Sequence, residues 1–165
     1  MVDEALFSSE RQDWGTPKDL FDRLHRIFNF QLDVAANEHN HKAATWYGAG
    51  GCEEDGLEAE WCPPYCEGMA WCNPPYGRGI TGLWVQKAIK EHVSNGCPSV
   101  LLLPARTDTA WFQEGVRYAY NIVFIRGRLK FEGAEHSAPF PSCLMIFGET
   151  TMLQRNELLE IGVVW

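Results

Sequence analysis

The short apolar run at residues 100–103 constrains the fold of this chain more than any other segment. Its consecutive apolar side chains indicate a strand that is buried on both faces, as strands of parallel sheets are. Before it, apolar side chains recur at helical spacing from Trp84 to Val93, with Thr81 as the expected cap and Asn95-Gly96 as the expected end of the helix. A helix leading into a buried strand predicts an α/β fold.

The remaining predicted elements continue this alternation. A helix is predicted from Thr16, whose hydroxyl would cap it ahead of Pro17, through an apolar face that includes Leu20 and Phe28. Further strands are predicted at residues 30–36, 69–72, 121–125 and 143–147, and a short helix at 110–116. Because no helix separates the last two strands, we expect them to pair antiparallel. The prediction is a mostly parallel sheet with an antiparallel C-terminal strand and helices on both faces.

Length and hydropathy favour one domain over residues 1–165. A chain of 165 residues with 45% hydrophobic content can bury one sizeable core. It contains no apolar run long enough to cross a membrane and no basic start followed by an apolar core, so neither a membrane span nor a signal peptide is expected. We therefore expect a cytoplasmic protein whose cysteines are reduced thiols rather than a disulfide framework.

The charge of the chain limits how it could hold nucleic acid. The net charge is −8, from 14 basic and 22 acidic side chains, which is the wrong sign for a broad electrostatic footprint. Any contact with nucleic acid must be local. The basic side chains do cluster in the second half, which permits one cationic face formed by Arg78, Lys87, Lys90, Arg106, Arg126, Arg128 and Lys130.

The motif Asn73-Pro74-Pro75-Tyr76 is the candidate catalytic segment of the chain. An exocyclic amine on adenine attacks a methyl sulfonium poorly unless acceptors draw on its hydrogens, and the Asn73 amide oxygen and the Pro74 carbonyl can supply two acceptors. The prolines fix the backbone, and Tyr76 offers a face for base stacking. Taken alone, the motif fits equally well with a rigid turn made by two prolines.

Beyond this motif, several ordered blocks between Trp14 and Phe147 resemble the phage-type DNA N6-adenine methyltransferases, the Dam-like family. They are Trp14-Gly15-Thr16-Pro17, Leu32-Asp33-Val34-Ala35-Ala36 with Asn40 and Lys42, Asp55-Gly56-Leu57, Asn73 to Tyr76, Leu103-Pro104-Ala105-Arg106, Arg126-Gly127-Arg128-Leu129 and Ala138-Pro139-Phe140-Pro141-Ser142. The resemblance implies a Rossmann-like class I S-adenosylmethionine-dependent methyltransferase, in a bacterial or phage-infected cell, with no separate target-recognition domain.

By this resemblance, S-adenosyl-L-methionine is the cofactor. Ala35-Ala36-Asn37 replaces the glycine-rich turn that many methyltransferases place after the first strand, and the ribose-binding residue is left open among Glu53, Glu54 and Asp55. The cofactor-binding residues implied are Trp14, Thr16, Pro17, Asp33, Ala35, Asp55 and Leu57.

The resemblance also implies DNA as the substrate, with the target adenine flipped out of the stack to reach Asn73. Arg106, Arg128 and Ser142 are the implied phosphate contacts, although Arg128 could equally form a salt bridge with a carboxylate.

Rival functions remain open at this point. An RNA base or a protein glutamine amide could be methylated at a similar site. A catalytically silent, zinc-stabilised DNA- or partner-binding module is the other alternative, although the cysteine spacing fits zinc poorly and no metal is expected. The cysteines concerned are Cys52, Cys62, Cys66 and Cys72, with His39 and His41 nearby.

Overall fold

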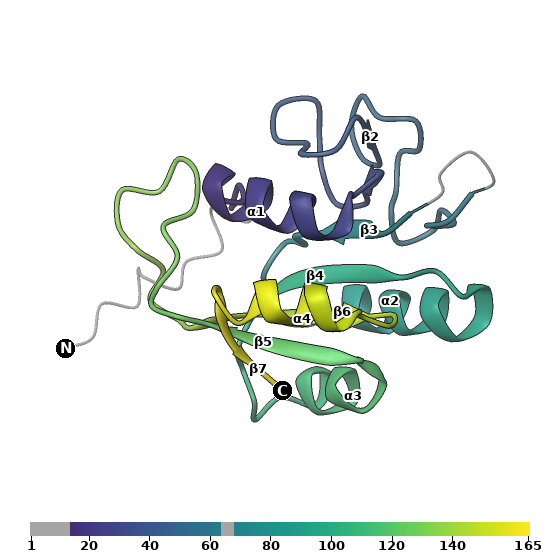
Figure 1. Cartoon of the computed structure of the whole chain (residues 1–165). Helices are drawn as coiled ribbons and strands as arrows, with labels where there is room; N and C mark the ends of the chain where they lie inside the picture. Colours follow the sequence, from purple (N-terminus) through teal and green to yellow (C-terminus); the bar gives the residue numbers. More distant parts are fainter. Residues whose placement is uncertain (1–13, 64–67) are drawn as a thin grey trace.

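The computed structural model describes residues 14–63 and 68–165, in which seven strands form one sheet with helices on both faces (Figure 1). The helices are α1 (Lys18–Phe28), α2 (Thr81–Asn95), α3 (Ala110–Tyr118) and α4 (Met152–Leu158). The strands are β1 (Leu32–Asp33), β2 (Thr45–Trp46), β3 (Ala70–Cys72), β4 (Ser99–Pro104), β5 (Asn121–Ile125), β6 (Ser142–Phe147) and β7 (Gly162–Val164).

The sheet is mixed, with the strand order β2-β1-β3-β4-β6-β5-β7. The pairs from β2 to β4 are parallel, and β6 lies between β4 and β5 and runs antiparallel to both. The predicted α/β class, the parallel first part and the antiparallel β5–β6 pair are confirmed. The prediction of a single antiparallel strand is wrong, because β7 also runs antiparallel to its neighbour β5.

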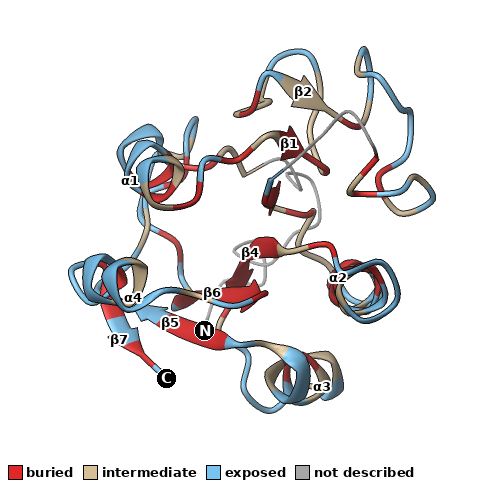
Figure 2. Ribbon diagram, turned by 45° about the vertical axis from the view of Figure 1, so that its right-hand side comes forward, coloured by how far each residue is buried: buried red, intermediate tan, exposed pale blue. Residues whose placement is uncertain are grey.

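Two apolar layers separate the helices from the sheet. Val100 and Leu102 of β4 face α1 and α4, whereas Leu101 and Leu103 face α2 and α3. All four side chains are fully buried, and Figure 2 shows the central strands β4 and β6 buried between helices whose outer surfaces are exposed. The alternating side chains of a strand enclosed on both faces explain the continuous apolar run that the sequence displays.

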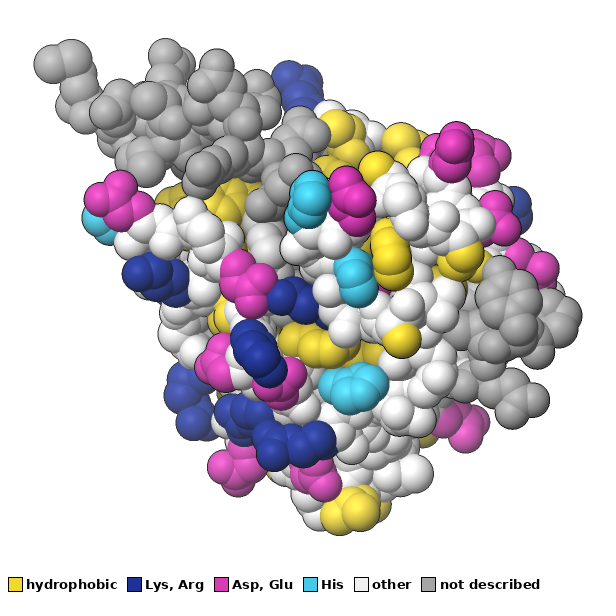
Figure 3. Space-filling model, turned by 90° about the horizontal axis from the view of Figure 1, so that it is seen from above, with side chains coloured by type: hydrophobic (Ala, Val, Ile, Leu, Met, Phe, Trp, Pro, Cys, Tyr) yellow, Lys and Arg dark blue, Asp and Glu magenta, His cyan; other side chains and the backbone are white. Residues whose placement is uncertain are grey.

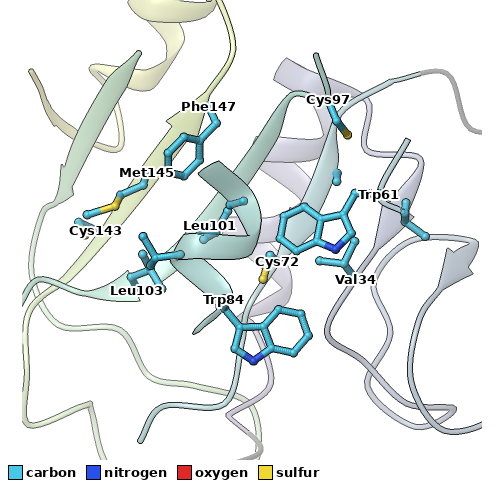
Figure 4. Packing of buried hydrophobic residues seen from close by; sticks show 14 of the residues in the cluster. Val34, Trp61, Cys72, Trp84, Cys97, Leu101, Leu103, Cys143, Met145 and Phe147 are labelled. Carbon is cyan, nitrogen blue, oxygen red and sulfur yellow. The ribbon is translucent and has the colours of Figure 1, made fainter. Parts of the chain in front are cut away.

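In the apolar layer between α2 and the sheet, Trp61 anchors part of the long connection between β2 and β3 to the core (Figure 4). Trp61 is buried with its ring centroid 6.4 Å from that of Trp84, and its indole nitrogen donates to the Gly56 carbonyl at 2.7 Å. Its backbone N–H donates to the Glu91 carboxylate. The described part of this connection, residues 47–63, is thereby held against α2 although it has little regular structure.

Two predicted helix caps are wrong. Pro17 occupies the cap position of α1 without a side-chain cap, because the Thr16 hydroxyl accepts from Asn73 instead. The Thr81 hydroxyl exchanges hydrogen bonds with the backbone of Gly77 and caps no free N–H of α2. The predicted end of α2 is confirmed, because Gly96 adopts a left-handed conformation with φ of 66°.

The buried face of α2 also differs from the prediction. Val93 is 62% exposed, whereas Lys87 and Glu91 are buried and their side chains approach to 2.6 Å. Lys87 is therefore removed from the predicted cationic face, because its charge is used within the protein.

The C-terminal segment holds two elements that the sequence did not predict, α4 and β7. Thr151 and Gln154 form a reciprocal capping box at the start of α4. The Gln154 side chain also donates to the Ile27 carbonyl at 3.1 Å, which ties α4 to α1.

The expectation of reduced thiols is wrong for two cysteines. Cys62 and Cys97 form a disulfide, with their Cα atoms 5.6 Å apart. Cys72 and Cys143 are buried free thiols and Cys52 is an exposed one, while Cys66 lies outside the described residues. Within residues 14–63 and 68–165, no three His, Cys, Asp or Glu side chains are grouped to hold a metal ion, and no helix could cross a membrane.

Candidate active site

Several polar residues converge at the carboxyl edge of the parallel strands. β1 ends at Asp33, β3 leads directly into Asn73, and β4 ends at Pro104. Ser142 pairs with Pro104, so the long connection at residues 126–141 meets the same edge (Figure 1). In open α/β sheets, ligands bind outside this edge.

The Asn73 side chain is held by three groups. Its amide nitrogen donates to the Trp14 carbonyl at 2.5 Å and to the Thr16 hydroxyl at 3.1 Å. Its amide oxygen lies 2.8 Å from the Tyr76 hydroxyl, which donates to it. The carbonyl partner at Trp14 requires a donor, and this fixes which end of the amide is nitrogen.

Tyr76 lies inside the fold in this structure. Its hydroxyl is also 3.0 Å from the Leu102 carbonyl of β4, and its ring meets those of Phe131 and Phe140 at steep angles, with centroids 6.0 and 5.8 Å away. Burial raises the pKa of Tyr76 well above its usual value, so this hydroxyl stays protonated and acts as a donor.

A strap formed by Trp14, Gly15 and Thr16 covers Asn73. The long connection fastens this strap, because the Glu132 backbone N–H donates to the Gly15 carbonyl at 2.8 Å. The rings of Trp14 and Phe131 lie 5.7 Å apart. The segment at residues 126–141 therefore packs on the site.

Asp33 is a buried carboxylate beside Asn73. It is 3% exposed and accepts from the backbone N–H groups of Lys42 at 3.0 Å and Ala35 at 3.4 Å. Burial raises its pKa to about 6, because desolvation outweighs these hydrogen bonds. A cationic ligand group would restore the charged form.

The turn after β1 is built from asparagines in place of glycines. The Asn37 side-chain oxygen accepts from the N–H groups of His39 and Asn40, and the Asn40 oxygen accepts from the Asn37 N–H at 2.7 Å. These bonds fold the chain back on itself without a left-handed residue. This explains how Ala35-Ala36-Asn37 replaces a glycine-rich turn.

Two adjoining cavities lie along this edge and share Ala35, Asn40 and Pro75. The smaller, of about 30 Å³, is lined by the strap and by Asp33, Lys42, Trp71 and Asn73. The larger, of about 160 Å³, is lined by Tyr47, Trp84, Glu54, Asp55 and glycine backbone, among others. Together they form a cleft. Charged side chains line the end next to Asn73, and aromatic and acidic side chains line the other end.

Most of the predicted cofactor residues lie in this cleft. Trp14, Thr16, Asp33 and Ala35 line the smaller cavity, and Ala35 and Asp55 line the larger one. Pro17 and Leu57 line neither: Pro17 precedes α1 and Leu57 packs against the core.

Sequence reasoning missed the far wall of the cleft. Tyr47 and Trp84 line it, and two glycines allow its backbone to pack closely. A Cβ at Gly48 would lie 1.8 Å from the Ala36 carbonyl oxygen, and one at Gly56 would lie 1.9 Å from that of Val34. In the sequence, the sign of this close approach was the presence of these two glycines in loop segments, since a residue without a Cβ lets two backbone segments meet.

The predicted DNA contacts fall into two groups. Arg106 and Arg128 are exposed, and among the described residues neither forms an ion pair, so no salt bridge occupies Arg128. Ser142 is 1% exposed, and its hydroxyl has no partner in the described part of the chain. On the face drawn in Figure 3, Lys and Arg side chains gather along one side among Asp and Glu side chains, so positive charge is local.

The fold and cleft define an α/β protein with a ligand site at the carboxyl edge of its parallel strands, where an Asn-Pro-Pro-Tyr loop supplies acceptor oxygens. The sequence model of one family, DNA N-6-adenine-methyltransferase (Dam), matches residues 4–158. The chain belongs to this family, which confirms the resemblance seen in the sequence.

Two phage proteins named DNA N-6-adenine-methyltransferase are similar to this chain. The protein of Haemophilus phage HP1 (strain HP1c1) is 35% identical over 119 residues, which cover 71% of this chain and 64% of the relative. The protein of Escherichia phage T1 is 33% identical over 117 residues, which cover 70% of this chain and 45% of the relative. The match thus spans less than two thirds of either relative.

Proposed function

We propose that this protein transfers a methyl group from S-adenosyl-L-methionine to the N6 amino group of adenine in DNA. The observation that carries the proposal is the position of Asn73, which follows β3 directly and lines the smaller cavity at the charged end of the cleft. Family membership and the names of the two phage relatives support the same activity.

The donor set of the cleft fits this cofactor. The methionine part carries an ammonium, which matches Asp33, and a carboxylate, which would share the Lys42 ammonium of the smaller cavity with Glu132. The ribose hydroxyls match the carboxylates of Glu54 and Asp55, and the adenine matches the apolar walls at Tyr47 and Trp84. When bound, S-adenosylmethionine supplies a methyl group attached to a positively charged sulfur. The sulfur leaves with the electron pair of the carbon–sulfur bond.

Asn73 and Pro74 would prepare the attacking amine. Hydrogen bonds from the N6 hydrogens to the Asn73 oxygen and the Pro74 carbonyl favour a pyramidal nitrogen whose lone pair forms the new carbon–nitrogen bond. Among the described residues none donates to the Pro74 carbonyl, but Pro74 is buried and lines neither cavity, so this contact requires the loop to expose its carbonyl when the base binds. The methylated nitrogen is cationic and releases one proton to water, so the site needs no strong base.

Tyr76 would serve as the stacking surface for the flipped base. In this structure its ring instead packs against Phe131 and Phe140. Stacking therefore requires the base to enter beside these rings or Tyr76 to turn toward it. Either event involves the long connection at residues 126–141, to which both phenylalanines belong.

DNA would be held through a small basic rim. Arg106, Arg126 and Arg128 are exposed and follow β4 and β5 at the edge that carries the cleft. Because the net charge is −8, phosphate contacts must be confined to this rim. Ser142 could join them only if the residues that bury it move.

The fold supports the finer assignment to Rossmann-like class I methyltransferases. A parallel half with its ligand cleft at the carboxyl edge is continued by the reversed strand β6 inserted between β4 and β5. The assignment rests on this strand order and on the acidic residue at the end of β1.

Radiolabelled S-adenosylmethionine incubated separately with unmethylated DNA, RNA and a bacterial protein extract tests the proposal. We expect label in DNA, recovered as N6-methyladenine after digestion. Label recovered only in RNA or in glutamine amides would assign the site to those substrates. Absence of cofactor binding by calorimetry would reject methyl transfer altogether.

A further inference from the structure

We infer that Thr16 is a positioning residue that orients the Asn73 amide so that only an acceptor position remains for the substrate. The inference rests on the proposed function and adds a role to a residue expected to touch only the cofactor. It starts from the hydrogen bonds around one side chain.

A primary amide has two N–H donors and an oxygen with two lone pairs. In Asn73 both donors are used, by the Trp14 carbonyl and by the Thr16 hydroxyl. Tyr76 uses one lone pair of the oxygen. The remaining position on this side chain is the second lone pair, which can accept from an amino group and repels a carbonyl oxygen.

The Trp14 carbonyl sets which end of the amide is nitrogen, and Thr16 is well placed to hold the amide there through a second hydrogen bond. It is 2% exposed and lines the same cavity as Asn73, so water competes little for its hydroxyl. The strap is held in place, because the Glu132 backbone N–H donates to the Gly15 carbonyl and the Phe131 ring contacts the Trp14 ring. The amide orientation is therefore coupled to the segment that borders the charged end of the cleft.

Tyr76 offers the amide oxygen an adjustable partner. Its single hydroxyl proton can go to Asn73 at 2.8 Å or to the Leu102 carbonyl at 3.0 Å. Turning toward Leu102 would release a lone pair for the substrate without leaving the proton unpaired. In the described part of the chain the Thr16 hydroxyl has no second side-chain partner of this kind, so the nitrogen end stays fixed while the oxygen end adapts.

The test compares Thr16→Val, which keeps the shape and removes the hydroxyl, with Thr16→Ser, which keeps the hydroxyl. With DNA and cofactor saturating, we expect the single-turnover methylation rate to fall about 10- to 100-fold in Thr16→Val, because a misplaced reacting group costs this much, and to stay within about threefold in Thr16→Ser. Because Thr16 also lines the cavity assigned to the cofactor, cofactor affinity is measured for both variants, and each rate is taken at saturating cofactor so that weaker cofactor binding does not lower it. Equal methylation rates in the two variants would overturn the inference. So would a rate loss in Thr16→Val that disappears when more cofactor is added.

A second measurement needs no activity and no variant at position 16. In the wild-type protein labelled with nitrogen-15, both hydrogens of the Asn73 side chain should exchange with solvent at least about tenfold more slowly than those of the exposed Asn156, whose resonance serves as the reference. Asn73→Ala assigns the signal. Fast exchange at Asn73 would reject the fixed amide even if the enzyme methylates DNA, whereas slow exchange in a protein without methylation would leave the geometry intact and reject the proposed function.

Discussion

The Lys42 ammonium lies 2.6 Å from the Glu132 carboxylate, and this ion pair joins the turn after β1 to the long connection between β5 and β6. Glu132 also holds the strap through its backbone, and Lys42 binds Asp33 through its own backbone. The two residues therefore clamp three segments around the charged end of the cleft.

A double-mutant cycle should detect this clamp. The side chains of Lys42 and Glu132 are 16% and 44% exposed, so Lys42→Met and Glu132→Gln should show a coupling of about 1 kcal/mol in the free energy of unfolding, decreasing with salt. The matched control is the more exposed pair Lys18–Asp22, whose coupling should be smaller. Equal coupling in both pairs would contradict the clamp.

Cofactor affinity should depend on the charge of Asp33. Burial raises the pKa of this carboxyl to about 6, and only its ionised form can pair with the cofactor ammonium. Affinity measured by calorimetry should be constant above this pH and fall roughly tenfold per pH unit below it. Asp33→Asn should remove the step.

A control for this pH dependence is His41, whose side chain acts electrostatically on Asp33. His41→Gln should preserve the step in affinity. A step that persists in Asp33→Asn would show that this carboxylate is not its cause.

The buried pair Lys87–Glu91 should stabilise the fold only as a pair. Lys87→Met alone leaves a buried carboxylate without its ammonium and should cost about 3 kcal/mol of unfolding free energy. Lys87→Met with Glu91→Met should cost less than the two single changes added together. Exposed Lys90→Met on the same helix is the control and should change stability by less than about 0.5 kcal/mol.

The same pair has a defined pH dependence. Burial alone would raise the pKa of Glu91, but hydrogen bonds from Lys87 and Asn95 outweigh it and the pKa lies below its ordinary value of 4.5. The stabilisation is therefore present above this value and is lost as the pH falls. Chemical denaturation of wild type and the double variant between pH 3 and 6 should show the difference shrinking toward acid.

The disulfide between Cys62 and Cys97 closes a loop with a sequence separation of 35 residues. Chain entropy predicts that reducing it lowers the free energy of unfolding by about 3 to 4 kcal/mol. Peptide mapping without reductant should recover the two cysteines as one linked peptide, and Cys52→Ser should leave this linkage unchanged. Recovery of Cys62 and Cys97 as free thiols would restore the sequence-based expectation.

The parts of the fold that could be predicted are those with strong local patterns. β5 is found at its predicted residues, and β4 extends the predicted apolar run by one residue on each side because its side chains are enclosed on both faces. The short elements α4 and β7 escaped prediction because α4 buries one residue, Leu158, and β7 has three residues. Periodicity cannot be recognised over such lengths.

Partners distant in sequence account for the remaining differences. Thr16 carries a sound local signal for a helix cap, yet its hydroxyl bonds to Asn73, 57 residues away. Lys87 and Glu91 are only four residues apart, but the sheet and the β2–β3 connection that bury them come from elsewhere in the chain. The insertion of β6 between β4 and β5 is set by nonlocal pairing. The place of the Asn73 motif after a strand could be predicted because its four residues are consecutive and follow a local apolar run.

The central claim is that the Asn73 amide oxygen promotes methyl transfer to adenine N6. The most direct measurement is N6-methyladenine formed in unmethylated DNA by wild type, Asn73→Ala and the exposed control Asn156→Ala, alongside cofactor affinity. We expect Asn73→Ala to lose at least about 100-fold in rate with nearly unchanged cofactor affinity, and Asn156→Ala to match wild type. Ordinary methylation by Asn73→Ala would contradict the account.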